Sequence, residues 1–163
     1  MRDGLVVDDE LRGSLSQSGH ETTTRHYRVR SCPQTPQPLP RLTQRLEAKQ
    51  QLRILAIGSS STWGVGATSH RKTYPSQLQA ILQAAIKGSR ATIINRGVSG
   101  EVAQATAERL RTEVALERPD IVLWQVGTND ALARVPTEDF ERTVSTTIDW
   151  LKQNNIDTAI VGL

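Results

Sequence analysis

Three short segments of this sequence carry side chains suited to acyl-transfer chemistry. The first holds three consecutive serines, Ser59, Ser60 and Ser61; the second reads NRGVSGE and ends at Glu101; the third, residues 127–130, reads GTND. A serine hydroxyl becomes an effective nucleophile when a base takes its proton. The transition state of acyl transfer also needs hydrogen-bond donors directed at the developing oxyanion. A site built from these segments therefore needs a base, such donors and the secondary-structure elements that bring them together.

Candidate donors accompany each of the three segments. Backbone N–H groups near Ser60 and Gly100, and the side-chain amide of Asn129, are donors of the required type. Glycine at position 100 allows the backbone to approach a ligand closely. These three residues are the candidate oxyanion-binding groups.

Three further side chains lie close to these segments in the sequence. Asp130 follows Asn129, and we expect it to support its loop rather than to take part in catalysis. Trp124 falls inside an apolar run, which predicts a core position. Trp63 follows the serine cluster, and whether it lines an acyl pocket is left open.

Short apolar runs alternate with amphipathic segments from residue 40 onward. The runs predict strands over 54–57, 91–94, 121–126 and 158–161. Helices are predicted from Pro40, from Pro75 to Gly88, from the loop 95–100 to about 117, and from an N-cap at Thr137 to about 151, with a loop over 59–73. This β-α-β-α-β-α-β order predicts an α/β fold, a three-layer flavodoxin-like parallel sheet with helices on both faces. Sites in such sheets lie at the carboxyl ends of the strands, where the three segments fall.

The first 39 residues have a different character. They are polar, show no apolar period, and end in a segment with four prolines between residues 33 and 40. Such a segment cannot offset its ordering entropy by burying apolar side chains. We predict a disordered leader and Pro-rich linker over 1–39 and a domain over 40–163. A PxxP ligand at residues 33–36 and an anion contact by Arg25, Arg28 and Arg30 are the less favoured interpretations.

Composition excludes several classes of function. The chain has 163 residues, a net charge of +3 and one cysteine, Cys32, so it has no internal disulfide and no cysteine-only metal site. The small positive charge is not typical of nucleic-acid binding, and no Walker or dinucleotide motif is present. We predict no cofactor and no metal. No membrane-spanning run or export signal is recognisable, which makes the cytoplasm the default expectation.

The three segments together resemble the SGNH (GDSL-type) hydrolases. ILAIGSSST, NRGVSGE and WQVGTND look like the serine, glycine and asparagine blocks of that family, in order, over residues 52–163. The resemblance implies an acyl-ester hydrolase without a cofactor, in which Ser60 is the nucleophile and its N–H, Gly100 and Asn129 form the oxyanion hole. It implies small-molecule, carbohydrate or lipid acyl esters as substrates. Ser59 stands where the family usually has Asp, and Ser61 where it usually has Leu.

The fourth block of the family, D-x-x-H, has no counterpart in this sequence. Its His is the general base, whereas the histidines here are His20 and His26 in the leader and His70 in the loop after the first strand. We therefore expect the domain over 40–163 to be truncated at its C-terminus, His70 to be solvated and the chain to be impaired as an enzyme. The alternatives are an inactive, C-terminally truncated fragment that at most binds a ligand, and a flavodoxin-like nucleotide or response-regulator domain. Apolar surface uncovered beyond the fourth strand predicts low stability or aggregation.

Overall fold

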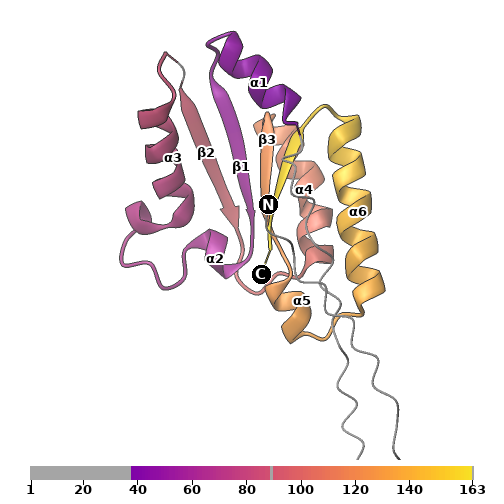
Figure 1. Ribbon diagram of the computed structural model, residues 1–163. Helices are drawn as coiled ribbons and strands as arrows, with labels where there is room; N and C mark the ends of the chain where they lie inside the picture. The colour runs from indigo at the N-terminus through magenta and orange to yellow at the C-terminus, as the bar shows by residue number, and fades with distance from the viewer. Residues whose placement is uncertain (1–37, 89, 163) are drawn as a thin grey trace, which may run out of the picture. The chain divides into compact units, whose positions relative to one another are not determined.

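A sheet of four parallel strands forms the centre of the described domain (Figure 1). The computed structural model describes residues 38–88 and 90–162. The strands lie in the spatial order β2 (Ala91–Gly97), β1 (Leu52–Gly58), β3 (Ile121–Gln125), β4 (Asp157–Val161). Because all pairs are parallel, the four carboxyl ends lie along the same edge of the sheet. The register places Gly58 beside Gly97 at that edge.

Helices cover both faces of the sheet. On one face, α4 (Ala103–Glu117) and α6 (Thr137–Gln153) enclose a core that contains Leu55, Val122 and the fully buried Trp124. On the other face, α1 (Pro40–Glu47) and α3 (Tyr74–Ala85) pack against a smaller cluster around Ile54 and Ile121. Alternate residues of each strand point to opposite faces, so the continuous apolar run of β1 supplies both cores.

Buried carboxylates attach α1 to the amino-terminal edge of the sheet. Asp120 is almost fully buried and accepts hydrogen bonds from Arg45 Nε at 2.7 Å and from the Arg53 N–H at 2.9 Å. Asp157 accepts a hydrogen bond from the N–H of Leu42 at 2.8 Å. A buried carboxylate needs such partners because its desolvation is costly. The first helix of the domain is thus anchored by charge as well as by its leucines.

The predicted fold class is confirmed, with corrections to individual elements. The strand order matches that of flavodoxin-like folds. The predicted 59–73 loop contains two short helices, α2 (Ser60–Trp63) and the 3-10 helix η1 (His70–Lys72), and α5 (Thr128–Leu132) was not predicted. β2 extends through Gly97, so the loop that was predicted over 95–100 begins only after Gly97. The prediction of Thr137 as N-cap is wrong, because Pro136 occupies that position without a side-chain cap and Thr137 is already helical.

The predicted leader lies outside the described residues, apart from residues 38 and 39. The PxxP motif, the three leader arginines, His20, His26 and Cys32 fall in that part. In the described part, no helix has the length and apolar character needed to cross a membrane.

Candidate active site

A sharp turn from β1 into α2 positions Ser60. Gly58 has a φ of +154°, and a Cβ there would lie 2.6 Å from both the Gln125 carbonyl oxygen and Thr62 Oγ1. Ser60 is the first residue of α2, so its N–H has no acceptor within the helix. The residue is half-buried. The turn therefore places Ser60 at the carboxyl edge of the sheet, with a backbone N–H that makes no hydrogen bond within the helix.

The three consecutive serines have different environments. Ser59 is buried, and its N–H and its hydroxyl both donate to Gln125 Oε1 at 2.9 Å. Ser61 is exposed to solvent. Ser59 thus connects β1 to β3, a role in which its hydroxyl is already committed. Ser60 remains the candidate nucleophile.

Close backbone contact fixes α2 against β2. A Cβ on Gly97 would lie 2.1 Å from the Trp63 nitrogen and 2.6 Å from the Thr62 carbonyl carbon. Asn95 Nδ2 donates to the Thr62 carbonyl oxygen at 2.7 Å, and Asn95 Oδ1 accepts from the Gly97 N–H at 2.9 Å. Only glycine permits so close an approach. The short helix that begins with Ser60 is therefore held by the strand beside it.

Thr62 connects the same helix to α3. Its side chain is fully buried, and its Oγ1 lies 3.1 Å from the hydroxyl of Tyr74. Burial raises the pKa of the Tyr74 hydroxyl, and the hydrogen bond with Thr62 lowers it by less. The Tyr74 phenol therefore stays protonated and uncharged at neutral pH.

Gly100 lies in the loop that follows β2. It has a φ of +85°, a left-handed conformation that favours glycine, and no atom outside its immediate neighbours lies within 4 Å of the position that a Cβ would take. The N–H of Val98 donates to the Gly58 carbonyl oxygen at 2.8 Å, which ties the start of this loop to the end of β1. Gly100 is exposed. Its backbone accordingly borders open space at the same edge as Ser60.

Asn129 lies on α5, directly after β3. Its Nδ2 donates to the carbonyl oxygen of Glu101 at 2.7 Å. The next residue, Asp130, is buried and accepts from the Ala103 N–H at 2.9 Å, at the start of α4. Asp130 therefore supports the loop, as the sequence indicated. The segments after β2 and β3 are joined by these two hydrogen bonds.

The candidate residues follow three adjacent strands. Ser60 follows β1, which lies between β2 and β3 in the sheet, whereas Gly100 follows β2 and Asn129 follows β3. Figure 1 shows α2 and α5 at the same end of the sheet. In a parallel sheet this edge, outside the carboxyl ends, is where ligands bind. A serine with candidate hydrogen-bond donors on both sides is an arrangement suited to acyl transfer.

His70 is the only histidine in the described part of the chain. It is exposed on η1, and within 38–88 and 90–162 no carboxylate is hydrogen-bonded to its ring. The same residues contain no cluster of three or more His, Cys, Asp or Glu side chains that could hold a metal ion. The described site therefore contains the candidate nucleophile and donors and lacks an oriented base.

Sequence reasoning did not identify two groups of supporting residues. Gln125 receives both Ser59 hydrogen bonds, and Glu101 forms an ion pair with Arg109. A glutamine at the end of an otherwise apolar strand is a signal that could have pointed to Gln125. Trp124 is fully buried, which confirms its predicted core position, whereas Trp63 is 63% exposed.

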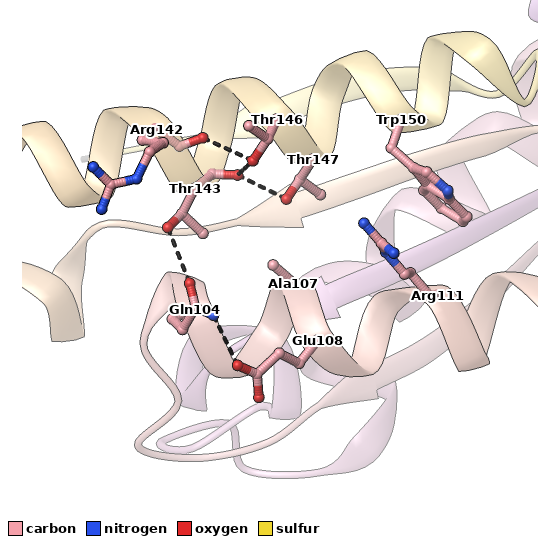
Figure 2. Close-up of a pocket in the computed structure, with 9 residues that line it drawn as sticks. All are labelled: Gln104, Ala107, Glu108, Arg111, Arg142, Thr143, Thr146, Thr147 and Trp150. Carbon is pink, nitrogen blue, oxygen red and sulfur yellow. Dashed lines mark hydrogen bonds between the residues drawn. The ribbon is translucent and has the colours of Figure 1, made fainter.

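A separate groove of about 460 Å³ lies between α4 and α6 (Figure 2). Figure 2 shows the Arg111 guanidinium beside the ring of Trp150, 5.5 Å from its centroid. Gln104 donates to Glu108 at 2.7 Å and accepts from Thr143 at 3.1 Å. These side chains pair with one another, and the lining contains no histidine, cysteine or serine. The strand-end site is therefore the better candidate for chemistry.

Comparisons with known proteins agree with the α/β fold and identify a family. The Non-GDSL lipase-like family matches residues 30–163. A search of curated proteins finds no match. Among solved structures, AlinE4, an SGNH-hydrolase family esterase, has 27% sequence identity and a TM-score of 0.63, over 69% of this chain and 59% of its own. A protein assigned to the G-D-S-L lipolytic family from Desulfitobacterium hafniense DCB-2 has 26% identity and a TM-score of 0.56, over 68% and 59%.

More distant structures share the fold. TesA has 21% identity and a TM-score of 0.62, over 68% of this chain and 60% of its own. The chain thus spans about three fifths of the length of these solved relatives.

Proposed function

The chain belongs to the Non-GDSL lipase-like family, and on that premise we propose that it hydrolyses acyl esters with Ser60 as the nucleophile. One observation carries this proposal. Ser60, Gly100 and Asn129 follow three adjacent strands, and a hydrogen bond from Asn129 to Glu101 joins the two flanking segments. Donors on both sides of a serine are what an oxyanion hole requires.

The proposed reaction forms and breaks bonds at one carbonyl carbon. Ser60 Oγ attacks that carbon while a base takes the hydroxyl proton, and the carbonyl oxygen becomes the oxyanion. The N–H groups of Ser60 and Gly100 and the Asn129 amide stabilise it. The alcohol leaves with the proton, and water hydrolyses the acyl-serine. Each oxyanion donor contributes about 10²–10³ in rate in enzymes of this kind. Among residues 38–88 and 90–162, no histidine is paired with a carboxylate that would orient it as this base.

Exposed apolar side chains accompany each segment of the site. Trp63 follows Ser60 by three residues on α2, Leu132 follows Asn129 by three residues on α5, and Val98 precedes Gly100 by two. Residues three apart on a helix lie on one face. We infer that the ester carries an apolar group, because covering these three exposed apolar side chains removes apolar surface from water.

Labelling with a fluorophosphonate tests the nucleophile. This reagent forms a phosphonyl-serine and releases fluoride, and its P=O oxygen occupies the position of the oxyanion. We expect labelling on Ser60 alone, slow because the described site lacks an oriented base, and no adduct in Ser60→Ala. Ser61→Ala, which changes the exposed neighbouring serine, is the matched control and should label like the wild type. Folded protein that is never labelled, or Ser60→Ala that still is, would refute the proposal.

The lack of an oriented base in the described part favours one alternative. A module that retains the oxyanion donors without turnover would bind an ester or its carboxylate product and would not react. Butyrate binding that depends on Asn129, in protein that does not label, would identify this case.

A further inference from the structure

We propose that the ion pair between Glu101 and Arg109 is a positioning device that sets the orientation of the Asn129 side-chain amide. This proposal rests on the proposed function, because the amide matters for catalysis only as an oxyanion donor. Neither Glu101 nor Arg109 touches the substrate in it. Both act through Asn129 and are positioning residues.

A hydrogen bond fixes the orientation of the Asn129 side-chain amide. Asn129 Nδ2 donates one hydrogen to the carbonyl oxygen of Glu101 at 2.7 Å. A carbonyl oxygen only accepts, so the NH₂ end of the amide faces Glu101 and the amide oxygen points away. The NH₂ group is planar, and once one hydrogen is committed the direction of the other is fixed. The position of the Glu101 carbonyl therefore decides where the second N–H of Asn129 points.

Hydrogen bonds to the side chain of Glu101 hold its backbone in place. Glu101 lies in the loop between β2 and α4, and a loop lacks the regular backbone hydrogen bonds that fix a strand or a helix. Its carboxylate accepts from Arg109 Nε at 3.0 Å and from Arg109 Nη2 at 2.7 Å. Thr106 Oγ1 donates to the same carboxylate at 3.1 Å. A two-bond arginine–carboxylate pair fixes orientation as well as distance.

Arg109, which holds Glu101, is itself fixed by contacts with a strand and a helix. Arg109 lies on α4, a helix of 15 residues, and its Nη2 also donates to the carbonyl oxygen of Arg96 on β2 at 2.9 Å. Its Nη1 is 3.3 Å from Glu113. The two paired side chains are only 23% and 15% exposed, so solvent screens the pair less than a surface pair. The carbonyl that orients Asn129 is thereby connected to both a strand and a long helix.

The pair also joins two donors of the candidate oxyanion hole. Glu101 directly follows Gly100, whose N–H is one donor, and its carbonyl holds Asn129, which supplies another. On the other side, Asp130 accepts from the Ala103 N–H at 2.9 Å. That second contact keeps α5 beside the start of α4 when Arg109 is changed. Loss of the pair should therefore misdirect the amide without detaching α5.

A mutant cycle tests whether Arg109 acts through Asn129. The readout is the second-order rate of fluorophosphonate labelling at Ser60. Removing an oxyanion donor costs about 10²–10³ in rate, so misdirecting one in Arg109→Ala should cost about tenfold. In the Asn129→Ala background the same change should cost less than about twofold, because coupled residues are not additive. Arg109→Lys keeps the charge but loses the two-bond geometry and should recover only part of the rate.

Arg53→Ala is the matched control for the cycle. Arg53 also pairs with a glutamate of α4, Glu117, at 3.1 Å, and is 39% exposed, but it lies near the amino-terminal end of β1. It should change labelling by less than about twofold. An equal loss in Arg53→Ala and Arg109→Ala, or the same loss from Arg109→Ala with and without Asn129, would overturn the positioning role.

A second measurement keeps this proposal separable from the proposed function. The side-chain NH₂ resonances of Asn129 are observed by ¹⁵N NMR and assigned by their disappearance in Asn129→Asp. Arg109→Ala should shift them and speed their exchange with water, whereas Arg53→Ala should not. Unchanged Asn129 resonances in Arg109→Ala would overturn the positioning role even in protein that never labels. Absent labelling with shifted resonances would refute only the proposed hydrolysis.

Discussion

Substitution of Gly97 by alanine tests how β2 positions the helix that begins with Ser60. The added Cβ would lie 2.1 Å from the Trp63 nitrogen, 2.6 Å from the Thr62 carbonyl carbon and 2.7 Å from the Trp63 Cα. Ordinary contacts of this kind are about 3.5 Å or longer, so α2 would have to move by more than about 1 Å. All three contacts are backbone atoms, and no side-chain rotation relieves them.

The cost of this change follows from two contributions. Overpacking at a tightly packed position typically costs about 1–3 kcal/mol. Moving α2 also breaks the hydrogen bond from Asn95 to the Thr62 carbonyl oxygen, 2.7 Å long, which is worth about 1 kcal/mol. We therefore expect Gly97→Ala to lower the free energy of unfolding by about 2–4 kcal/mol, a large share of the 5–15 kcal/mol typical of a domain. Labelling of Ser60 should fall with it.

Urea unfolding followed by circular dichroism measures the stability difference. Gly66→Ala is the matched control, because Gly66 has a φ of +85° and no atom within 4 Å of the added Cβ. It should lose only the energy of backbone strain, about 1–2 kcal/mol. Gly97→Ala that is no less stable than Gly66→Ala would refute the conclusion that α2 is held against β2 by backbone contact.

Three further predictions concern α1, α3 and substrate choice. Asp120→Ala should lower the free energy of unfolding by about 2–4 kcal/mol in urea titrations, because it leaves Arg45 and the Arg53 N–H without their acceptor. Exposed Asp139→Ala, as its control, should cost less than about 0.5 kcal/mol. Burial raises the pKa of Tyr74 above its ordinary 10.0, so the unfolded chain loses that proton first. The contribution of Tyr74 to stability should be constant below pH 10 and should decrease as pH rises toward the folded pKa, so stability in that range should fall less steeply in Tyr74→Phe when unfolding is repeated at each pH. Trp63→Ala should slow labelling by a long-chain alkyl fluorophosphonate at least about threefold more than by its ethyl analogue, since about 0.8 kcal/mol is lost per uncovered methylene; equal slowing would contradict an apolar subsite.

The sequence specified the central strands and the residues that follow them. Ile54 to Ile57 is a continuous apolar run that ends at a glycine, and such a run is typical of a strand buried on both faces. The structure places that run in β1 and Ser60 directly after it. Strands of this kind can be predicted from sequence, because the apolar residues of each strand themselves indicate that it is buried.

The short helices and the supporting contacts depended on partners far along the chain. Ser59 and Gln125 are 66 residues apart, and Asn129 and Glu101 are 28 apart. Nothing in the local sequence of α2 or α5 marks a helix, since each has at most five residues. A helix this short gains too few hydrogen bonds to form alone and is stabilised by its tertiary contacts.

By itself, the sequence determined a parallel α/β sheet and which side chains stand at its carboxyl edge, because strand burial and glycine-containing turns are local properties. Only the tertiary structure decided that Ser59 is committed to Gln125 while Ser60 begins α2. It also decided that the side chain of Glu101 pairs with Arg109 while its carbonyl oxygen accepts from the amide of Asn129. The direction of a hydrogen bond depends on where two distant segments meet, and that is fixed by packing across the sheet rather than by any single stretch of residues.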